Sequence, residues 1–166
     1  MSQTALSLLT LALRKAHGME TQALELLERQ AARLERFPEL QAQIQRHLGE
    51  TERQLERIED CLDALGEYTH EVPGGSSTAV PVRSVVPANG DLLDETFADY
   101  ALENYEIAAY RSLLTLCEMA VQRSIAPLLQ ESLKEEEGMA RWLRDNLSRL
   151  TRDYVTECER DQATAA

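Results

Sequence analysis

The segment "ALENYEIAAYRSLL", residues 101–114, has the apolar periodicity of an amphipathic helix, yet two glutamates interrupt its apolar side. The stripe advances in steps of three and four residues and consists of Leu93, Thr96, Tyr100, Glu103, Ile107, Tyr110, Leu114, Cys117 and Val121. Glu103 therefore occupies a core position, and Glu106 lies on the neighbouring row. Because burial of an unpaired carboxylate costs several kcal/mol, both side chains require a partner inside the fold.

Composition limits the classes of protein that this sequence can encode. Its 166 residues are enough for one domain, and the scarcity of aromatic residues, at 5%, beside abundant Leu, Ala, Glu, Gln and Arg favours helices. A formal charge of -12 argues against nucleic-acid and anionic-membrane surfaces and fits a cationic ligand. We find neither a run of ~20 apolar residues nor a signal peptide, so we expect a cytoplasmic protein.

Four periodic segments predict an all-α fold. The expected helices span about 5–36, 38–66, 91–122 and 125–158, and Pro38 separates the first two as a tight hairpin. Residues 68–90 contain three of the five prolines and predict a crossover loop. Two antiparallel hairpins joined by a long crossover form a four-helix bundle with the topology of ferritin-like folds. We expect a single domain over residues 1–160 and a disordered tail over 161–166.

Each predicted helix carries a polar residue on its apolar stripe. In each hairpin one glutamate precedes the turn by 17 residues and another follows it by 13. Residues equally far from the turn of an antiparallel hairpin lie at one level, so these side chains are expected to converge near mid-bundle. The candidates are Glu20, His47, Glu50, Glu103, Glu106 and Glu136.

A cluster of buried acids needs a compensating charge, because neighbouring carboxylates repel and raise one another's pKa. Carboxylates with one imidazole suit iron or manganese, and facing helices of this kind can hold one or two ions. The alternative is that these glutamates flank the core and face water, as charged residues beside a core usually do. Arg53 could also neutralise a carboxylate and displace a metal, leaving the site reduced or empty.

Three stretches resemble a known family. "HLGETERQLERIEDCLDALGE" (47–67), "ENYEIAAYRSLLTLCEMA" (103–120) and "LLQESLKEEEGMARWL" (128–143) are similar to helices of the YciE/YciF family of bacterial ferritin-like stress proteins. "GMETQALELL" (18–27) resembles the family's first helix more weakly. The resemblance implies a ferritin-like bundle that forms a homodimer, a di-metal centre and a role in stress tolerance.

The six candidate ligands match family positions, but other positions depart from the family pattern. Asn104 stands where the family usually has His, and Arg53 and Met139 stand where a ferritin-type Glu-x-x-His motif would place imidazoles. Two functions stay open. In one, Glu50 and Glu136 bridge two ions in a redox or oxidant-scavenging enzyme, with Glu20 and either Glu103 or Glu106 as terminal ligands. In the other, a non-catalytic helical protein acts through protein contacts under stress.

Overall fold

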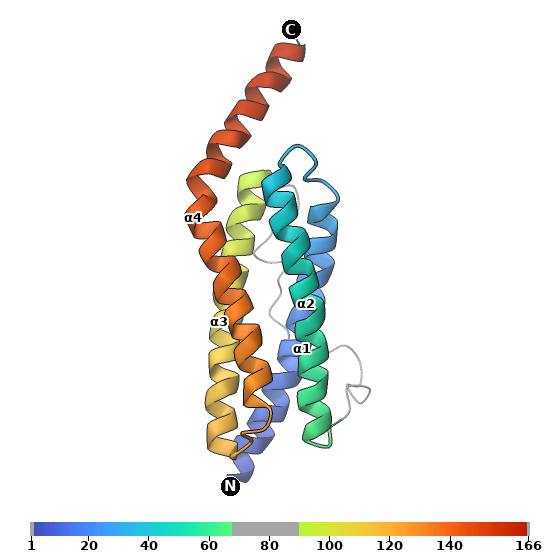
Figure 1. Ribbon diagram of the computed structural model, residues 1–166, viewed down its shortest axis with the longest axis vertical. Coiled ribbons are helices and arrows are strands. Elements are labelled where there is room, and N and C mark those ends of the chain that lie inside the picture. The colour runs from blue at the N-terminus through green and yellow to red at the C-terminus, as the bar shows by residue number, and fades with distance from the viewer. Residues whose placement is uncertain (1, 68–89, 166) are drawn as a thin grey trace.

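The computed structural model describes residues 2–67 and 90–165, and every regular element in these ranges is an α-helix. The helices are α1 (Gln3–Ala31), α2 (Pro38–Ala64), α3 (Leu92–Ala120) and α4 (Ala126–Ala165). Helix α1 contacts α2 and α3, and α4 also contacts α2 and α3, so the four helices form the predicted bundle (Figure 1). The predicted crossover lies outside the described residues except for Gly90.

The first hairpin turns earlier than the sequence pattern predicts. Helix α1 ends at Ala31 rather than near residue 36, because residues 32–37 reverse the chain direction. Backbone hydrogen bonds from Arg33 N to Gln30 O (2.9 Å) and from Phe37 N to Leu34 O (2.8 Å) hold this turn. Pro38 then begins α2, where its missing N–H is tolerated.

Helix ends elsewhere follow the expected capping chemistry. Asp91 caps α3, since its side chain accepts hydrogen bonds from the backbone N–H groups of Leu93 and Asp94. Gly66 adopts a left-handed φ of 76° just beyond α2, as its predicted capping role requires. Val121, which ends α3, adopts a φ of 60° and is strained, because a β-branched side chain disfavours this conformation.

Helix α4 continues through residues 161–165, where the sequence pattern predicts a disordered tail. It extends beyond the other three helices at its C-terminal end (Figure 1). Arg36 holds this extension, with its guanidinium donating to both carboxylate oxygens of Asp161 at 2.8 and 2.9 Å. The same guanidinium donates to Glu157 at 2.8 Å. These contacts tie the first hairpin to α4 and account for the longer helix.

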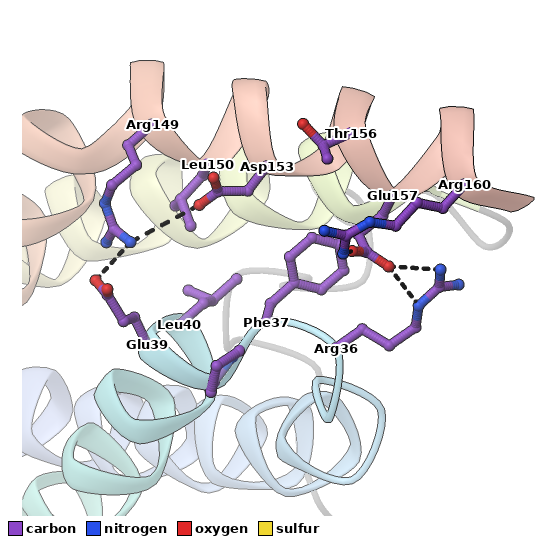
Figure 2. Close-up of a pocket in the computed structure, with 11 residues that line it drawn as sticks. Arg36, Phe37, Glu39, Leu40, Arg149, Leu150, Asp153, Thr156, Glu157 and Arg160 are labelled. Atoms are coloured by element: carbon purple, nitrogen blue, oxygen red, sulfur yellow. Dashed lines mark hydrogen bonds and ion pairs between the residues drawn. The ribbon is translucent and has the colours of Figure 1, made fainter.

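A surface cavity of about 250 Å³ lies between the first hairpin and α4 (Figure 2). Phe37, Leu40 and Leu150 supply its apolar lining, and Arg149 reaches Glu39 at 2.5 Å across it. None of the six candidate metal ligands lines this cavity.

The described interior contains two large apolar clusters with a polar layer between them, and a small third cluster of Ala23, Leu26 and Leu102. The first cluster, at the α3–α4 turn, contains Leu9, Leu13, Ile58, Leu62, Leu113, Leu129 and their neighbours. The second cluster, at the α1–α2 turn, contains Leu27, Leu34, Leu40, Ile44, Met139, Leu143 and Leu150. The polar layer consists of Glu20, His47, Glu103, Glu106 and Glu136, which lie between the two clusters in the order of residues along each helix. Within the described residues, no helix combines the length and apolar character of a membrane span.

Candidate metal centre

Five of the six predicted ligands meet inside the bundle. The polar layer draws one residue from each of α1, α2 and α4 and two from α3, and each is at most 2% exposed. Glu106 is as deeply buried as Glu103, so the inward face of α3 is centred between the two sequence rows. The bundle therefore places four carboxyl groups and one imidazole in a space closed to solvent.

His47, Glu103 and Glu136 form the tightest group. His47 Nε2 lies 3.2 Å from Glu103 Oε1 and 3.6 Å from Glu136 Oε2. One ligand atom from each of the three residues lies within 4.8 Å of the others. These side chains come from α2, α3 and α4, so the group forms only when both hairpins pack together.

Glu50 lies on the other side of the imidazole. The Nδ1–H group of His47 donates to Glu50 Oε2 at 3.1 Å, while Nε2 faces Glu103 and Glu136. The Glu50 side chain is 20% exposed, unlike the five residues of the polar layer. A carboxylate on the far nitrogen of an imidazole fixes the ring orientation, which is a common arrangement around metal-bound histidines. This position differs from the bridging role expected from the sequence.

Tyr110 joins the polar layer from α3. Its hydroxyl donates to Glu20 Oε1 at 2.6 Å, and its side chain is fully buried. This is the one hydrogen bond that the described residues give to Glu20 from another helix, and it fixes that carboxyl group against α3.

Several carboxyl oxygens in the polar layer lack a donor. Among residues 2–67 and 90–165, no hydrogen-bond partner reaches Glu103 Oε2, Glu106 Oε1 or either oxygen of Glu136. A buried acceptor without a partner costs roughly 1–3 kcal/mol, so four such oxygens in one layer would be strongly destabilising on their own. Cation coordination would compensate all four, and this donor set, carboxylates with one imidazole, matches the preferences of iron and manganese. The residues present therefore fit a metal centre.

Burial dominates the acid–base properties of this layer. It raises the pKa of Glu20 from 4.5 to about 7 despite the Tyr110 hydrogen bond. Burial, followed by repulsion from Glu136, raises the pKa of Glu106 well above its ordinary value. Burial, followed by the charge of Glu103, likewise raises the pKa of Glu136 well above its ordinary value. Without a cation, some of these carboxyl groups hold protons near neutral pH.

For the pKa of His47, neighbouring charges outweigh burial. Burial alone would lower the pKa of the imidazole, but the charge of Glu103 and its neighbours outweighs burial and raises this pKa well above 6.5. The hydrogen bond from His47 in turn lowers the pKa of Glu50. A protonated His47 thus neutralises part of the acidic charge when no metal is bound.

The three family departures lie away from the His47 group. Asn104 is exposed and donates to the backbone oxygen of Tyr100 at 2.7 Å, so an imidazole there would not reach the polar layer. Met139 packs in the second apolar cluster. Arg53 is 54% exposed and forms an ion pair with Glu135 at 3.7 Å. The charge of Arg53 contributes to the lowered pKa of Glu50, but among the described residues Arg53 forms no ion pair with the polar layer.

A different arginine takes the buried position. Arg57 is 8% exposed and donates to both oxygens of Glu135 at 2.7 and 3.1 Å. Gln54 also donates to Glu135, at 3.1 Å. Glu135 is thus held outside the polar layer, while its neighbour Glu136 points inward. The sequence pattern did not single out Arg57.

A second buried pair was also missed. Gln30 Nε2 donates to Asp99 Oδ2 at 2.7 Å, and both side chains are almost fully buried. Burial raises the pKa of Asp99 from 3.8 to about 7, in spite of that hydrogen bond. Asp99 lies four residues before Glu103, and this helical spacing was the signal that could have identified it.

Comparison with known proteins places this geometry in context. A protein of Xanthomonas campestris pv. campestris superposes with a TM-score of 0.76 and 26% identity, covering 95% of this chain and 99% of the other. The E. coli stress protein YciF superposes with a TM-score of 0.72 and 23% identity, covering 91% and 99%. A bacterioferritin of Desulfovibrio desulfuricans, described with a diiron site, gives 0.74 and 18%, covering 93% and 88%. These likenesses confirm the ferritin-like fold.

Sequence comparison supports the same relationship. Protein YciF of Escherichia coli (strain K12) is 30% identical over 103 residues, which are 55% of this chain and 60% of YciF, so the alignment spans less than two-thirds of that relative. The model of a family described as a domain of unknown function (DUF892) matches residues 4–156. The resemblance to YciF-like proteins predicted from the helices is confirmed, and the chain belongs to the DUF892 family.

Proposed function

We propose that the polar layer is a carboxylate-rich centre for one or two iron or manganese ions, with a redox or oxidant-scavenging role in stress response. The observation that carries this proposal is the set of four carboxyl oxygens without a hydrogen-bond donor in the layer that contains His47, between two large apolar clusters. Neutral donors would satisfy these oxygens one at a time, whereas a divalent cation satisfies several together. The description of E. coli YciF as a stress protein supports the physiological setting.

The proposed ligands divide into two groups. His47 Nε2, Glu103 and Glu136 hold one ion, because their ligand atoms already converge. Glu106 and Glu20, the remaining members of the layer, are the candidates for a second ion. Iron or manganese in this position would supply electron-transfer chemistry toward dioxygen or peroxide.

The surrounding residues prepare the layer for this role. Glu50 accepts the Nδ1 proton of His47 and leaves Nε2 free to face the two nearest carboxylates. Tyr110 fixes Glu20 through its hydroxyl. The raised pKa values of Glu20, Glu106 and Glu136 mean that cation binding releases protons from these carboxyl groups.

A non-catalytic function is the alternative. Here the protein acts through protein contacts under stress, and its site is degenerate or empty. The ion pairs of a protonated His47 with Glu103 and Glu136 support this reading, since they offset acidic charge without a metal. Arg53 contributes less to this, because it lies at the surface and its charge acts on Glu50, outside the polar layer.

Two further expectations belong to the same proposal. We propose that the protein forms a homodimer, in keeping with the resemblance to YciF-like proteins, and sedimentation as a monomer at all concentrations would contradict this. The cytoplasmic location expected from the sequence stays a prediction.

Thermal unfolding with chelator, Mn(II) or Fe(II) tests the centre. The untagged protein should gain about 2.7 kcal/mol at a hundredfold excess of ion over its dissociation constant. Glu136→Gln should lose most of this gain and keep equal or higher stability in chelator, because it removes a repelling buried charge. Glu137→Gln is the matched control, since Glu137 is partly exposed and pairs with Arg111 at the surface.

The two functions predict different outcomes. The metal centre predicts that ions raise the melting temperature of wild type and of Glu137→Gln but not of Glu136→Gln. The non-catalytic alternative predicts that neither ion moves the wild-type curve. In that case Glu136→Gln should cost roughly 3 kcal/mol in chelator, because it breaks a buried charge pair with His47.

A further inference from the structure

Beside the polar layer, toward the α1–α2 turn, two buried polar side chains face each other. Gln30 on α1 is 1% exposed, and Asp99 on α3 is 3% exposed. Gln30 donates its amide N–H to Asp99 Oδ2 at 2.7 Å. This contact ties α1 to α3 one helical turn from Glu103, on the side away from Tyr110.

The orientation of Gln30 leaves its oxygen without a partner. The amide nitrogen faces the carboxyl group of Asp99, as an ionised carboxylate requires. Gln30 Oε1 is fully buried, and no donor in the described parts of the chain reaches it. A buried amide oxygen without a partner is costly, and either a hydrogen-bond donor or a cation would satisfy it.

Glu103 supplies the third acceptor. Its Oε1 faces His47, while its Oε2 has no partner among the described residues. Asp99 and Glu103 are four residues apart on the buried face of α3, which sets their Cβ atoms about 5–6 Å apart. Glu103 is close enough to Asp99 for its charge to raise the pKa of that group, and Gln30 contacts Asp99 directly, so the three side chains are neighbours.

We propose that Gln30, Asp99 and Glu103 form a second subsite for a divalent cation, distinct from the group around His47. The proposal rests on the proposed metal centre, because Glu103 belongs to both sites. Its donors are oxygen atoms alone, which suits hard cations such as Mn(II). Without an imidazole, this subsite binds more weakly than the centre and fills after it.

Binding of Mn(II), measured by electron paramagnetic resonance of the free ion, tests the subsite in the full-length protein. Wild type should show a tight class of ions and a weaker class. Asp99→Asn should remove the weaker class and change the affinity of the tight class by less than about threefold, because Asn keeps a hydrogen-bond acceptor for Gln30. Glu118→Gln, an exposed change on the same helix, should leave both classes unchanged.

A second variant keeps the test decisive if Asp99→Asn folds poorly. Gln30→Met removes the amide oxygen with little change in volume, and it should weaken the weaker class by about tenfold. A binding curve equal to that of wild type in both variants would overturn the subsite. Loss of the tight class in Asp99→Asn would also overturn it, since Asp99 would then belong to the centre itself.

Glu136→Gln separates this proposal from the one on which it rests. If wild type binds no Mn(II), both proposals fail. If wild type binds ions that Glu136→Gln loses and Asp99→Asn keeps, the centre stands and the subsite falls. If Glu136→Gln loses the tight class and retains a weak class that Asp99→Asn lacks, both stand.

Discussion

Glu20→Gln should stabilise the metal-free protein, and the size of the effect follows from burial. The pKa of Glu20 rises from 4.5 to about 7 in the folded chain, where its side chain is 1% exposed. At about 1.36 kcal/mol for each pH unit, this difference corresponds to about 3 kcal/mol of lost stability once the group is ionised. Gln retains an acceptor for the Tyr110 hydroxyl, and its amide can donate to neighbouring carboxyl oxygens.

The sign of the pH dependence follows from proton binding. The folded state holds the Glu20 proton more tightly than the unfolded chain, so this contribution to stability is complete below pH 4.5. It is lost as the pH rises toward about 7 and stays lost above that value. The difference in free energy of unfolding between Glu20→Gln and wild type should therefore grow by roughly 2 kcal/mol in favour of the variant as the pH rises from about 5 to about 8.

Urea unfolding followed by circular dichroism, in the presence of chelator, measures this difference. Glu25→Gln is the control, because Glu25 is an exposed acid on the same helix. Its replacement should change the free energy of unfolding by the same amount at both pH values. A difference between wild type and Glu20→Gln that does not change with pH would refute the reasoning. Destabilisation by Glu20→Gln at high pH would mean that the Glu20 carboxylate is held by a partner other than a metal.

Three other substitutions test separate features of the fold. Tyr110→Phe should cost roughly 1–3 kcal/mol in urea unfolding, because it strands the buried carboxyl group of Glu20. Arg57→Met should cost roughly 3 kcal/mol by breaking a buried, bidentate ion pair, whereas Arg53→Met should cost less than about 1 kcal/mol, since that side chain is exposed. Val121→Gly should raise the melting temperature, with a gain of about 1 kcal/mol, because glycine adopts a φ of 60° without strain; an unchanged melt would show that the turn relaxes around valine.

The helical repeat explains why so much of the interior could be predicted. Residues three and four apart share a face, so the amino-acid sequence alone marks an acid that recurs on an apolar stripe as buried. Glu20, His47, Glu103 and Glu136 were identified in this way, and all four lie inside the bundle. Their binding of a metal stays a prediction.

The rotation of each helix about its own axis could not be predicted. Four residues advance a helix by about 40° beyond one full turn, so Arg57 lies about 40° from Arg53 around α2. That difference turns Arg57 toward α4 and leaves Arg53 at the surface. The same uncertainty hid Asp99, because the sequence stripe passed through its neighbour Tyr100, which is only partly buried.

The division of the interior into two apolar clusters and a polar layer has a consequence for how this protein can change. Most of the hydrophobic packing lies toward the two ends of the bundle, where leucine and isoleucine side chains pack beside the helix turns. The middle layer carries a standing electrostatic cost, because burial raises the pKa of several of its carboxyl groups. Residues of the layer can therefore be exchanged at less risk to the scaffold than residues of the two large apolar clusters.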